Sequence, residues 1–233
     1  MELSEQDRLK EAAAVYAAGQ LQDGMVVGLG SGTTARMAVR AIGRRVKDGL
    51  RIVGIPTSEQ TAKLAKGLDI VLSTLGDYPR IDITVDGADE VERGTLNLIK
   101  GGGGNQLREK IVASASARLL IVDDETKVVE RLGTRAPVPV EVAQFGWQAT
   151  AHSLAELKGN PTLRKVSNGE IFVTDGGNYI LDCAFGPIDS AEALCRELDS
   201  LTGVVEHGLF IGMASLALVG SDSGVIELRR TAQ

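Results

Sequence analysis

Two aspartates in the segment Asp86-Gly87-Ala88-Asp89 are the first residues whose types and spacing could carry out chemistry. They follow an apolar run, and carboxylates three positions apart in a glycine-containing loop can converge on one small polar substrate. Because close like charges raise the pKa of one carboxyl, such a pair suits proton transfer. The alternative is that an aspartate only caps the next turn. Glu90, which follows them, is expected to be a solvated charge.

A run of four glycines lies between Lys100 and a predicted helix that carries Glu109. Because glycine loses the most backbone freedom on folding, a run of this length indicates a backbone wrapped around a ligand. Gly101, Gly102 and Gly103 are the candidate contacts. Lys100 could stabilise a developing oxyanion. Glu109 falls in the first turns of the helix, where the helix dipole could keep its carboxylate ionised until it meets a substrate.

The segment from Gly28 to Thr34 joins a predicted strand to a predicted helix and contains three glycines and three hydroxyls. It lacks the last glycine of the dinucleotide fingerprint and the lysine of a Walker A loop. Free N–H groups at a helix N-terminus attract anions, so the loop suits a phosphate monoester or sugar hydroxyls. Its candidate contacts are Ser31, Gly32, Thr33 and Thr34. The alternative is a tight turn before a hydroxyl-capped helix.

Lys127 is a fourth candidate, because it lies just beyond another predicted strand, where a cation could meet a substrate anion. Most lysines in such loops are simply solvated. Cys183 and Cys195 are expected to be reduced and packed in the interior, and neither His152 nor His207 has an evident partner. Since the chain contains no CxxC, HxH or HExxH motif, a histidine and cysteine metal site is not expected.

Helix and strand patterns alternate along the first 125 residues. Apolar spacing predicts helices over 5–19, 33–45, 58–66 and 105–117, and strands over 25–29, 51–55, 69–72, 81–85 and 119–122. This alternation predicts an α/β fold with a doubly wound, mostly parallel sheet. In such sheets ligands bind outside the carboxyl ends of the strands, so the candidate segments are expected to meet at one edge.

The pattern changes near residue 137. A strand there, helices over 147–158 and 189–200, and strands over 162–166, 170–174, 179–183 and 203–207 predict a smaller α+β domain. The predicted division is an α/β catalytic domain, residues 1–132 plus 209–233, with an inserted α+β domain, residues 133–208. A predicted hairpin of strands 215–219 and 225–228 returns the chain to the first domain.

Composition narrows the possible functions. The chain has 233 residues, with 25 Lys+Arg against 31 Asp+Glu for a net charge of −6, and only 3% aromatic residues. Nucleic-acid binders present a basic face and often stacking aromatics, so a nucleic-acid partner is not expected. No apolar run approaches the roughly 18 residues of a membrane span, and the first seven residues do not resemble a signal peptide. The sequence predicts a cytoplasmic protein without a membrane partner.

Four segments together resemble the type A ribose-5-phosphate isomerase family: Gly28–Ala35, Val85–Glu90, Ile99–Gly104 with Arg108–Lys110, and Pro137–Glu141. They occur in the family's order, and the resemblance runs over nearly the whole chain. It implies a doubly wound α/β domain with a smaller α+β domain inserted before the C-terminus.

The resemblance also implies a reaction, the interconversion of D-ribose 5-phosphate and D-ribulose 5-phosphate through an enediolate, without a metal or organic cofactor. Glu109 would be the base that moves a proton between C2 and C1, and Lys100 would stabilise the enediolate. Asp86 and Asp89 would bind sugar hydroxyls and assist ring opening. The implied substrate-binding residues are Ser31, Gly32, Thr33, Thr34, Gly87, Ala88, Gly101, Gly102, Gly103 and Lys127. A homodimer or homotetramer is the implied assembly.

Three other functions stay open at this point. A non-catalytic sugar-phosphate sensor would keep the binding loop but would not need Glu109, Lys100 and the aspartates. A coenzyme A transferase would use a glutamate nucleophile and bind a large nucleotide, for which no recognition segment is evident. An amino-sugar-phosphate deaminase would be recognised by ammonia release from glucosamine 6-phosphate.

Overall fold

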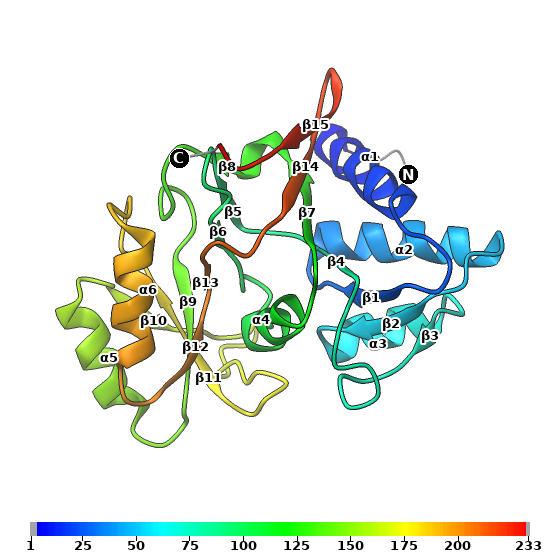
Figure 1. Cartoon of the computed structure of the whole chain (residues 1–233). Helices are drawn as coiled ribbons and strands as arrows, with labels where there is room; N and C mark the ends of the chain where they lie inside the picture. The colour runs from blue at the N-terminus through cyan, green and yellow to red at the C-terminus, as the bar shows by residue number, and fades with distance from the viewer. Residues whose placement is uncertain (1–3, 232–233) are drawn as a thin grey trace.

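The computed structural model describes residues 4–231 and is built around a seven-stranded sheet (Figure 1). The strand order is β15-β14-β7-β4-β1-β2-β3, and every neighbouring pair is parallel except β14 and β15. The strands are β1 (Val26–Leu29), β2 (Val53–Pro56), β3 (Val71–Leu72), β4 (Ile83–Asp86), β7 (Leu119–Asp124), β14 (Leu216–Ser221) and β15 (Gly224–Leu228). The predicted doubly wound, mainly parallel sheet is confirmed, and the predicted C-terminal hairpin forms part of it.

The position of β4 beside β1 creates a place where a ligand can bind. The chain runs from β1 to β2 and β3 on one side, and then continues through β4, β7 and β14 on the other. Loops that leave the carboxyl ends of β1 and β4 therefore diverge and open a crevice. Leu29 at the end of β1 pairs with Val85 in β4, so the loops that follow these two strands begin side by side.

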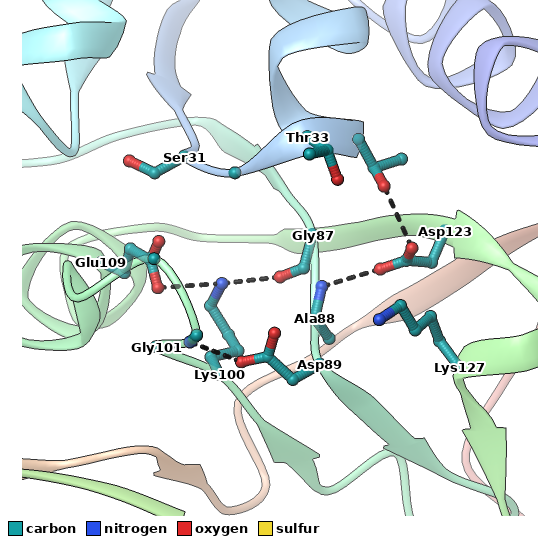
Figure 2. A pocket seen from close by; sticks show the side chains of 14 residues that line it. Ser31, Thr33, Gly87, Ala88, Asp89, Lys100, Gly101, Glu109, Asp123 and Lys127 are labelled. Carbon is teal, nitrogen blue, oxygen red and sulfur yellow. Dashed lines mark hydrogen bonds and ion pairs between the residues drawn. The ribbon is translucent and has the colours of Figure 1, made fainter. Parts of the chain in front are cut away.

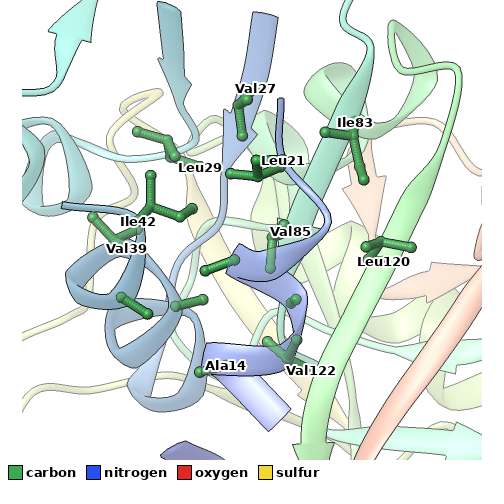
Figure 3. Packing of buried hydrophobic residues seen from close by; sticks show 14 of the residues in the cluster. Ala14, Leu21, Val27, Leu29, Val39, Ile42, Ile83, Val85, Leu120 and Val122 are labelled. Atoms are coloured by element: carbon green, nitrogen blue, oxygen red, sulfur yellow. The ribbon is translucent and has the colours of Figure 1, made fainter. Parts of the chain in front are cut away.

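Helices cover both faces of this sheet. They are α1 (Glu5–Gly19), α2 (Thr33–Lys47), α3 (Glu59–Lys66) and α4 (Gln106–Ser114). Figure 3 shows α1 and α2 packed on one face, where Ala14, Val39 and Ile42 meet the apolar side chains of β1, β4 and β7. Strand side chains that point to the other face of the sheet, such as Val26, pack with Val112 of α4. Burial of each large apolar side chain stabilises this core by about 1.5–3 kcal/mol.

A second sheet is formed entirely by residues 138–207. Its antiparallel order is β10-β11-β9-β12, and α5 and α6 cover one face (Figure 1). The elements are β9 (Val138–Val142), α5 (Trp147–Glu156), β10 (Pro161–Leu163), β11 (Tyr179–Cys183), α6 (Ala191–Ser200) and β12 (Val204–His207). The predicted division of the chain at residues 132/133 and 208/209 stays a prediction.

The predicted strand over 170–174 is wrong. Ile171 forms only an isolated bridge with Lys165, and the rest of this segment makes no ladder. The chain turns at Gly169 just before the segment, and the Thr174 hydroxyl accepts the N–H groups of Gly176 and Asn178 just after it. Alternating β-branched residues suggested a strand, but two close turns leave it too short to pair.

A third, small sheet joins these two parts and was not predicted. Its order is β13-β6-β5-β8, with β5 (Glu90–Glu92), β6 (Leu98–Ile99), β8 (Val128–Val129) and β13 (Leu209–Phe210). β13 follows the second sheet in the chain but pairs with β6, which precedes it. Among residues 4–231, no helix is both long enough and apolar enough to cross a membrane.

Glu90, expected to be a solvated charge, is instead fully buried. Its carboxylate accepts the backbone N–H groups of Gly133 at 2.7 Å, Arg135 at 2.5 Å and Ala136 at 2.8 Å. A buried carboxylate is tolerated when it is fully hydrogen-bonded. Glu90 therefore anchors the segment that leads from the first part of the chain into the second sheet.

Glu90→Ala should lower the free energy of unfolding by about 3 kcal/mol, because three backbone N–H groups lose a buried, charged acceptor. Urea unfolding followed by circular dichroism measures this change. Glu130→Ala is the matched control, since the Glu130 side chain is 82% exposed and pairs with Arg93 at the surface. Equal effects of the two substitutions would contradict the anchoring role of Glu90.

Candidate active site

A pocket lies at the carboxyl ends of β1, β4 and β7, at the crevice between the loops that follow β1 and β4 (Figure 2). Its empty volume, mouth included, is about 430 Å³. It is lined by Ser31, Gly32, Thr33, Thr34, Gly87, Ala88, Asp89, Lys100, Gly101, Gly102, Gly103, Glu109, Asp123 and Lys127. All the candidate residues from the sequence lie here except Asp86, and Asp123 is an addition.

Lys100 is the centre of the pocket's charge. Its ammonium lies 3.0 Å from Asp86 Oδ2 and 3.1 Å from Glu109 Oε2, and it donates to the carbonyl oxygen of Gly87 at 2.6 Å. All three charged residues are less than 5% exposed. The Lys100 ammonium is the only polar partner of this buried Glu109 oxygen within residues 4–231.

Burial controls the protonation of this cluster. Burial would lower the pKa of Lys100, but the carboxylates of Asp86 and Glu109 raise it above its usual range. Burial raises the pKa of Glu109 to about 8, although Lys100 opposes the shift. Burial also raises the pKa of Asp86. Asp86 and Glu109 contact the same ammonium, so the two carboxyl groups titrate as a pair.

The expectation that the helix dipole keeps Glu109 ionised is therefore wrong. Glu109 does lie in the first turn of α4, but the loss of hydration in the interior outweighs the favourable N-terminal dipole. The result is a carboxyl group that changes protonation near neutral pH.

The two aspartates do not converge on the pocket as a pair, contrary to expectation. Asp86 is 1% exposed and lies behind Lys100, where its Oδ1 accepts the N–H groups of Ser31 and Gly87. A Cβ on Gly30 would lie 2.2 Å from this oxygen, so only glycine lets the first loop approach so closely. Asp89 lines the pocket and accepts the Gly102 N–H at 2.7 Å.

The first loop differs from the hydroxyl-capped alternative. Gly32 is the N-cap of α2, and it makes no side-chain capping bond to the first N–H groups of this helix. Gly32, Thr33 and Thr34, at this helix end, line the pocket. The Ser31 hydroxyl pairs with Thr57 at 2.6 Å, and the Thr34 hydroxyl donates to Asp123 at 3.1 Å. Thr33 is the exposed hydroxyl of the three.

Asp123, at the end of β7, is the pocket residue that sequence reasoning missed. It accepts the Thr34 hydroxyl and the Ala88 N–H, which links the loops after β1 and β4 (Figure 2). Burial raises the pKa of Asp123 to about 6, against these hydrogen bonds and the charge of Lys127. An aspartate at the carboxyl end of a buried strand was the available signal, and only Lys127 four residues later was selected.

Outside the pocket, His207 has partners that the sequence did not reveal. Its Nε2 lies 3.1 Å from Asp199 Oδ1 and 3.7 Å from Cys195 Sγ, and its Nδ1 accepts the Leu209 N–H. These three side chains are of metal-ligating types and lie within 4.8 Å of one another. Because Nδ1 accepts a hydrogen bond, the neutral ring carries its proton on Nε2, which suits donation to Asp199 rather than metal binding. His152 also has a partner, Glu156, at 3.6 Å.

Known proteins are similar to this chain in sequence and in fold. The family model for Ribose 5-phosphate isomerase A (phosphoriboisomerase A) matches residues 53–224. The ribose-5-phosphate isomerase A of Gloeobacter violaceus is 56% identical over 219 residues, which cover 94% of this chain and 95% of that protein. The one from Thermomicrobium roseum is 50% identical over 225 residues, 97% of this chain and 95% of that protein.

Solved structures agree with these sequence matches. Ribose 5-phosphate isomerase A from Methanocaldococcus jannaschii superposes with a TM-score of 0.93 at 40% identity, covering 97% of this chain and all of that one. A D-ribose-5-phosphate isomerase in complex with phospho-erythronic acid gives a TM-score of 0.94 at 37% identity, with the same coverage. With sequence and fold in agreement over nearly its whole length, the chain belongs to the ribose 5-phosphate isomerase A family.

Proposed function

We propose that this pocket interconverts D-ribose 5-phosphate and D-ribulose 5-phosphate, the aldose–ketose isomerisation of the pentose phosphate pathway. Family membership and the names of close relatives support the reaction. The observation that carries the residue roles is the buried Lys100 ammonium between Glu109 and Asp86, in a pocket that the N-terminus of α2 also lines. A cation, a base and an anion site are the three parts that this reaction needs.

Glu109 is the base. Its carboxylate removes the C2 proton of the open-chain aldose, the electron pair forms the C1–C2 double bond, and the aldehyde oxygen becomes the enediolate oxygen. The same carboxyl group returns the proton to C1 while the proton on O2 moves to O1, so atoms and charge balance. A pKa of about 8 suits a group that must both take and give a proton near neutral pH.

Lys100 stabilises the negative charge of the enediolate. Asp86 and the Gly87 carbonyl hold its ammonium before substrate binds, so no reorganisation is needed as charge develops. Asp86 therefore acts from behind, by holding Lys100. Asp89 faces the pocket, binds sugar hydroxyls and assists ring opening and the proton shift between O1 and O2.

The N-terminus of α2 and Lys127 bind the phosphate. The N–H groups that follow Gly32 lack a side-chain cap, and a helix N-terminus attracts anions. Thr33 adds an exposed hydroxyl, and Lys127 lines the same pocket. The other proposed substrate contacts are Ser31, Thr34, Gly87, Ala88, Gly101, Gly102 and Gly103.

The proposed working form is a cytoplasmic homodimer or homotetramer that needs neither a metal nor an organic cofactor. The resemblance to the family supports this assembly. Val15 and Tyr16 on α1 are 49% and 42% exposed, which gives apolar surface that a second copy could cover. Sedimentation velocity measures the assembly, and a single species of monomer mass would contradict it.

Glu109→Gln should lower kcat for ribulose 5-phosphate formation at least about 100-fold, the scale of a lost general base. The amide keeps the size of the side chain but cannot accept the C2 proton, so binding of ribose 5-phosphate should persist. The assay is run in EDTA, so that wild-type turnover also tests metal independence. Glu130→Gln, at an exposed position, is the control.

Near-normal turnover in Glu109→Gln would remove this residue as the base. A folded wild-type protein that binds ribose 5-phosphate without converting it would favour the sensor function. Ammonia release from glucosamine 6-phosphate would favour the deaminase.

Activity should rise with pH as Glu109 loses its proton. Burial raises the pKa of Glu109 to about 8, so the base form is scarce at acidic pH and predominates only above this value. The profile of kcat/KM, which reports on the free enzyme, should climb to a plateau above about pH 8. Lys100→Met removes the positive charge that opposes this rise in the pKa of Glu109. The acidic limb of the kcat/KM profile should therefore move to higher pH, and the plateau should fall.

The substrate is the control for this experiment, because a phosphate monoester loses its second proton near pH ~6. If kcat/KM instead rises near this pH, and if Lys100→Met leaves that rise where it is, the titration belongs to the substrate phosphate rather than to Glu109.

A further inference from the structure

We propose that Arg164, which lies in the region that forms the second sheet, is a positioning residue that fixes two peptide groups of the glycine run, so that the Gly102 N–H holds Asp89 and the Gly103 N–H meets the substrate. The proposal rests on the isomerase function described above. It gives residues 138–207, which contribute no side chain to the pocket lining, a defined part in the reaction.

Arg164 directly follows β10, and its guanidinium donates both to the glycine run and to the carboxylate of Asp182. Its Nη1 donates to the carbonyl oxygens of Gly101 at 2.9 Å and Gly102 at 3.2 Å. On the other side, Nε donates to Asp182 Oδ2 at 2.9 Å, and Nη2 donates to the second oxygen of the same carboxylate. The guanidinium also lies 5.8 Å from the centre of the Phe172 ring. With its planar donors engaged on both sides, the side chain has one orientation.

The hold on these carbonyls sets the direction of the next N–H groups. A trans peptide points its C=O and its N–H in opposite directions, and residues 4–231 contain no cis peptide. The Gly102 N–H therefore points away from Arg164, and it donates to Asp89 at 2.7 Å (Figure 2). The Gly103 N–H, on the peptide whose carbonyl is that of Gly102, is turned away from the guanidinium in the same way.

The Gly102 N–H fixes the Asp89 carboxylate, and the Gly103 N–H, which has no hydrogen-bond partner within residues 4–231, is the donor left for an anionic oxygen of the substrate. Both glycines line the pocket that holds Lys100 and Glu109. Gly101 has a φ of +102° that other residues rarely adopt, and its carbonyl also accepts the Gly104 N–H at 2.9 Å, so an internal turn sets part of the orientation of the run and a partner from outside can fix the rest. Arg164 supplies that partner from a different sheet.

The oriented peptide groups should stabilise the enediolate more than they stabilise the bound sugar. Enediolate oxygens carry more negative charge than hydroxyl or carbonyl oxygens, and preorganised N–H groups stabilise such charge most strongly. Misdirected peptides should therefore weaken binding of the transition state more than binding of the substrate.

The test compares Arg164→Met with Arg164→Lys, using ribose 5-phosphate as substrate and phospho-erythronic acid as inhibitor. The two oxygens of the inhibitor's carboxylate share a negative charge and stand in for O1 and O2 of the enediolate, which lie on adjacent carbons. Arg164→Met should lower kcat/KM at least about tenfold and raise the inhibition constant by a similar factor. The KM for ribose 5-phosphate should change much less. Arg164→Lys keeps the charge but loses the planar fork, so it should resemble Arg164→Met more than wild type.

Arg131→Met is the matched control, because Arg131 pairs with Asp189 at 2.8 Å through side chains that are both more than half exposed. Thermal unfolding is recorded for every variant. KM and the inhibition constant do not depend on the concentration of folded enzyme, so their ratio is informative even when part of a preparation fails to fold.

Three results would overturn the proposal: an Arg164→Met protein as active as Arg131→Met, equal increases in KM and in the inhibition constant, or full rescue by Arg164→Lys. An inactive wild type would instead refute the isomerase function itself. An active wild type with unaffected Arg164 variants would refute only the positioning role.

Discussion

One buried ammonium held between two buried carboxylates is the interaction on which the rest of the pocket depends. Each charge would be strongly unfavourable in the interior without the others. Their meeting requires three separate elements: Asp86 ends β4, Lys100 follows β6, and Glu109 lies in the first turn of α4. The switch point between β1 and β4 provides the edge at which these elements can gather. Burial, opposed by the charge of Lys100, raises the pKa of Glu109 to about 8, so this carboxyl group titrates near neutral pH.

The sequence predicted the elements and the pocket because both depend on local patterns. Apolar periodicity located α1, α2 and the parallel strands to within a few residues. Polar segments at predicted strand ends had to meet at one edge of a doubly wound sheet, and the structure brings Thr33, Asp89 and Glu109 into one pocket there. Glycine spacing was informative for the same reason, since Gly30 is required for the close approach to Asp86.

The errors of sequence reasoning concern partners that are distant in the chain. Glu90 looked solvated because nothing nearby shows that residues 133–136 will surround it with N–H groups. Asp86 was expected to line the pocket. Its place behind Lys100 depends on a hydrogen bond from the Ser31 N–H, 55 residues earlier, which no local pattern indicates. The small third sheet pairs β6 with β13, more than 100 residues later in the chain, and strands of two residues carry no periodic signal. Arg164 hydrogen-bonds to the Gly101 carbonyl 63 residues earlier in the chain, and no sequence motif indicates this contact.

Folding of this chain takes up a proton around neutral pH. A free glutamate ionises near pH 4.5, whereas burial raises the pKa of Glu109 to about 8 in the folded protein. Between these values the folded chain holds a proton that the unfolded chain has released. The free energy of unfolding therefore falls as pH rises through this window, with the full loss reached above the folded pKa. The carboxyl group that makes the pocket reactive thus also sets an alkaline limit on the stability of the fold that holds it.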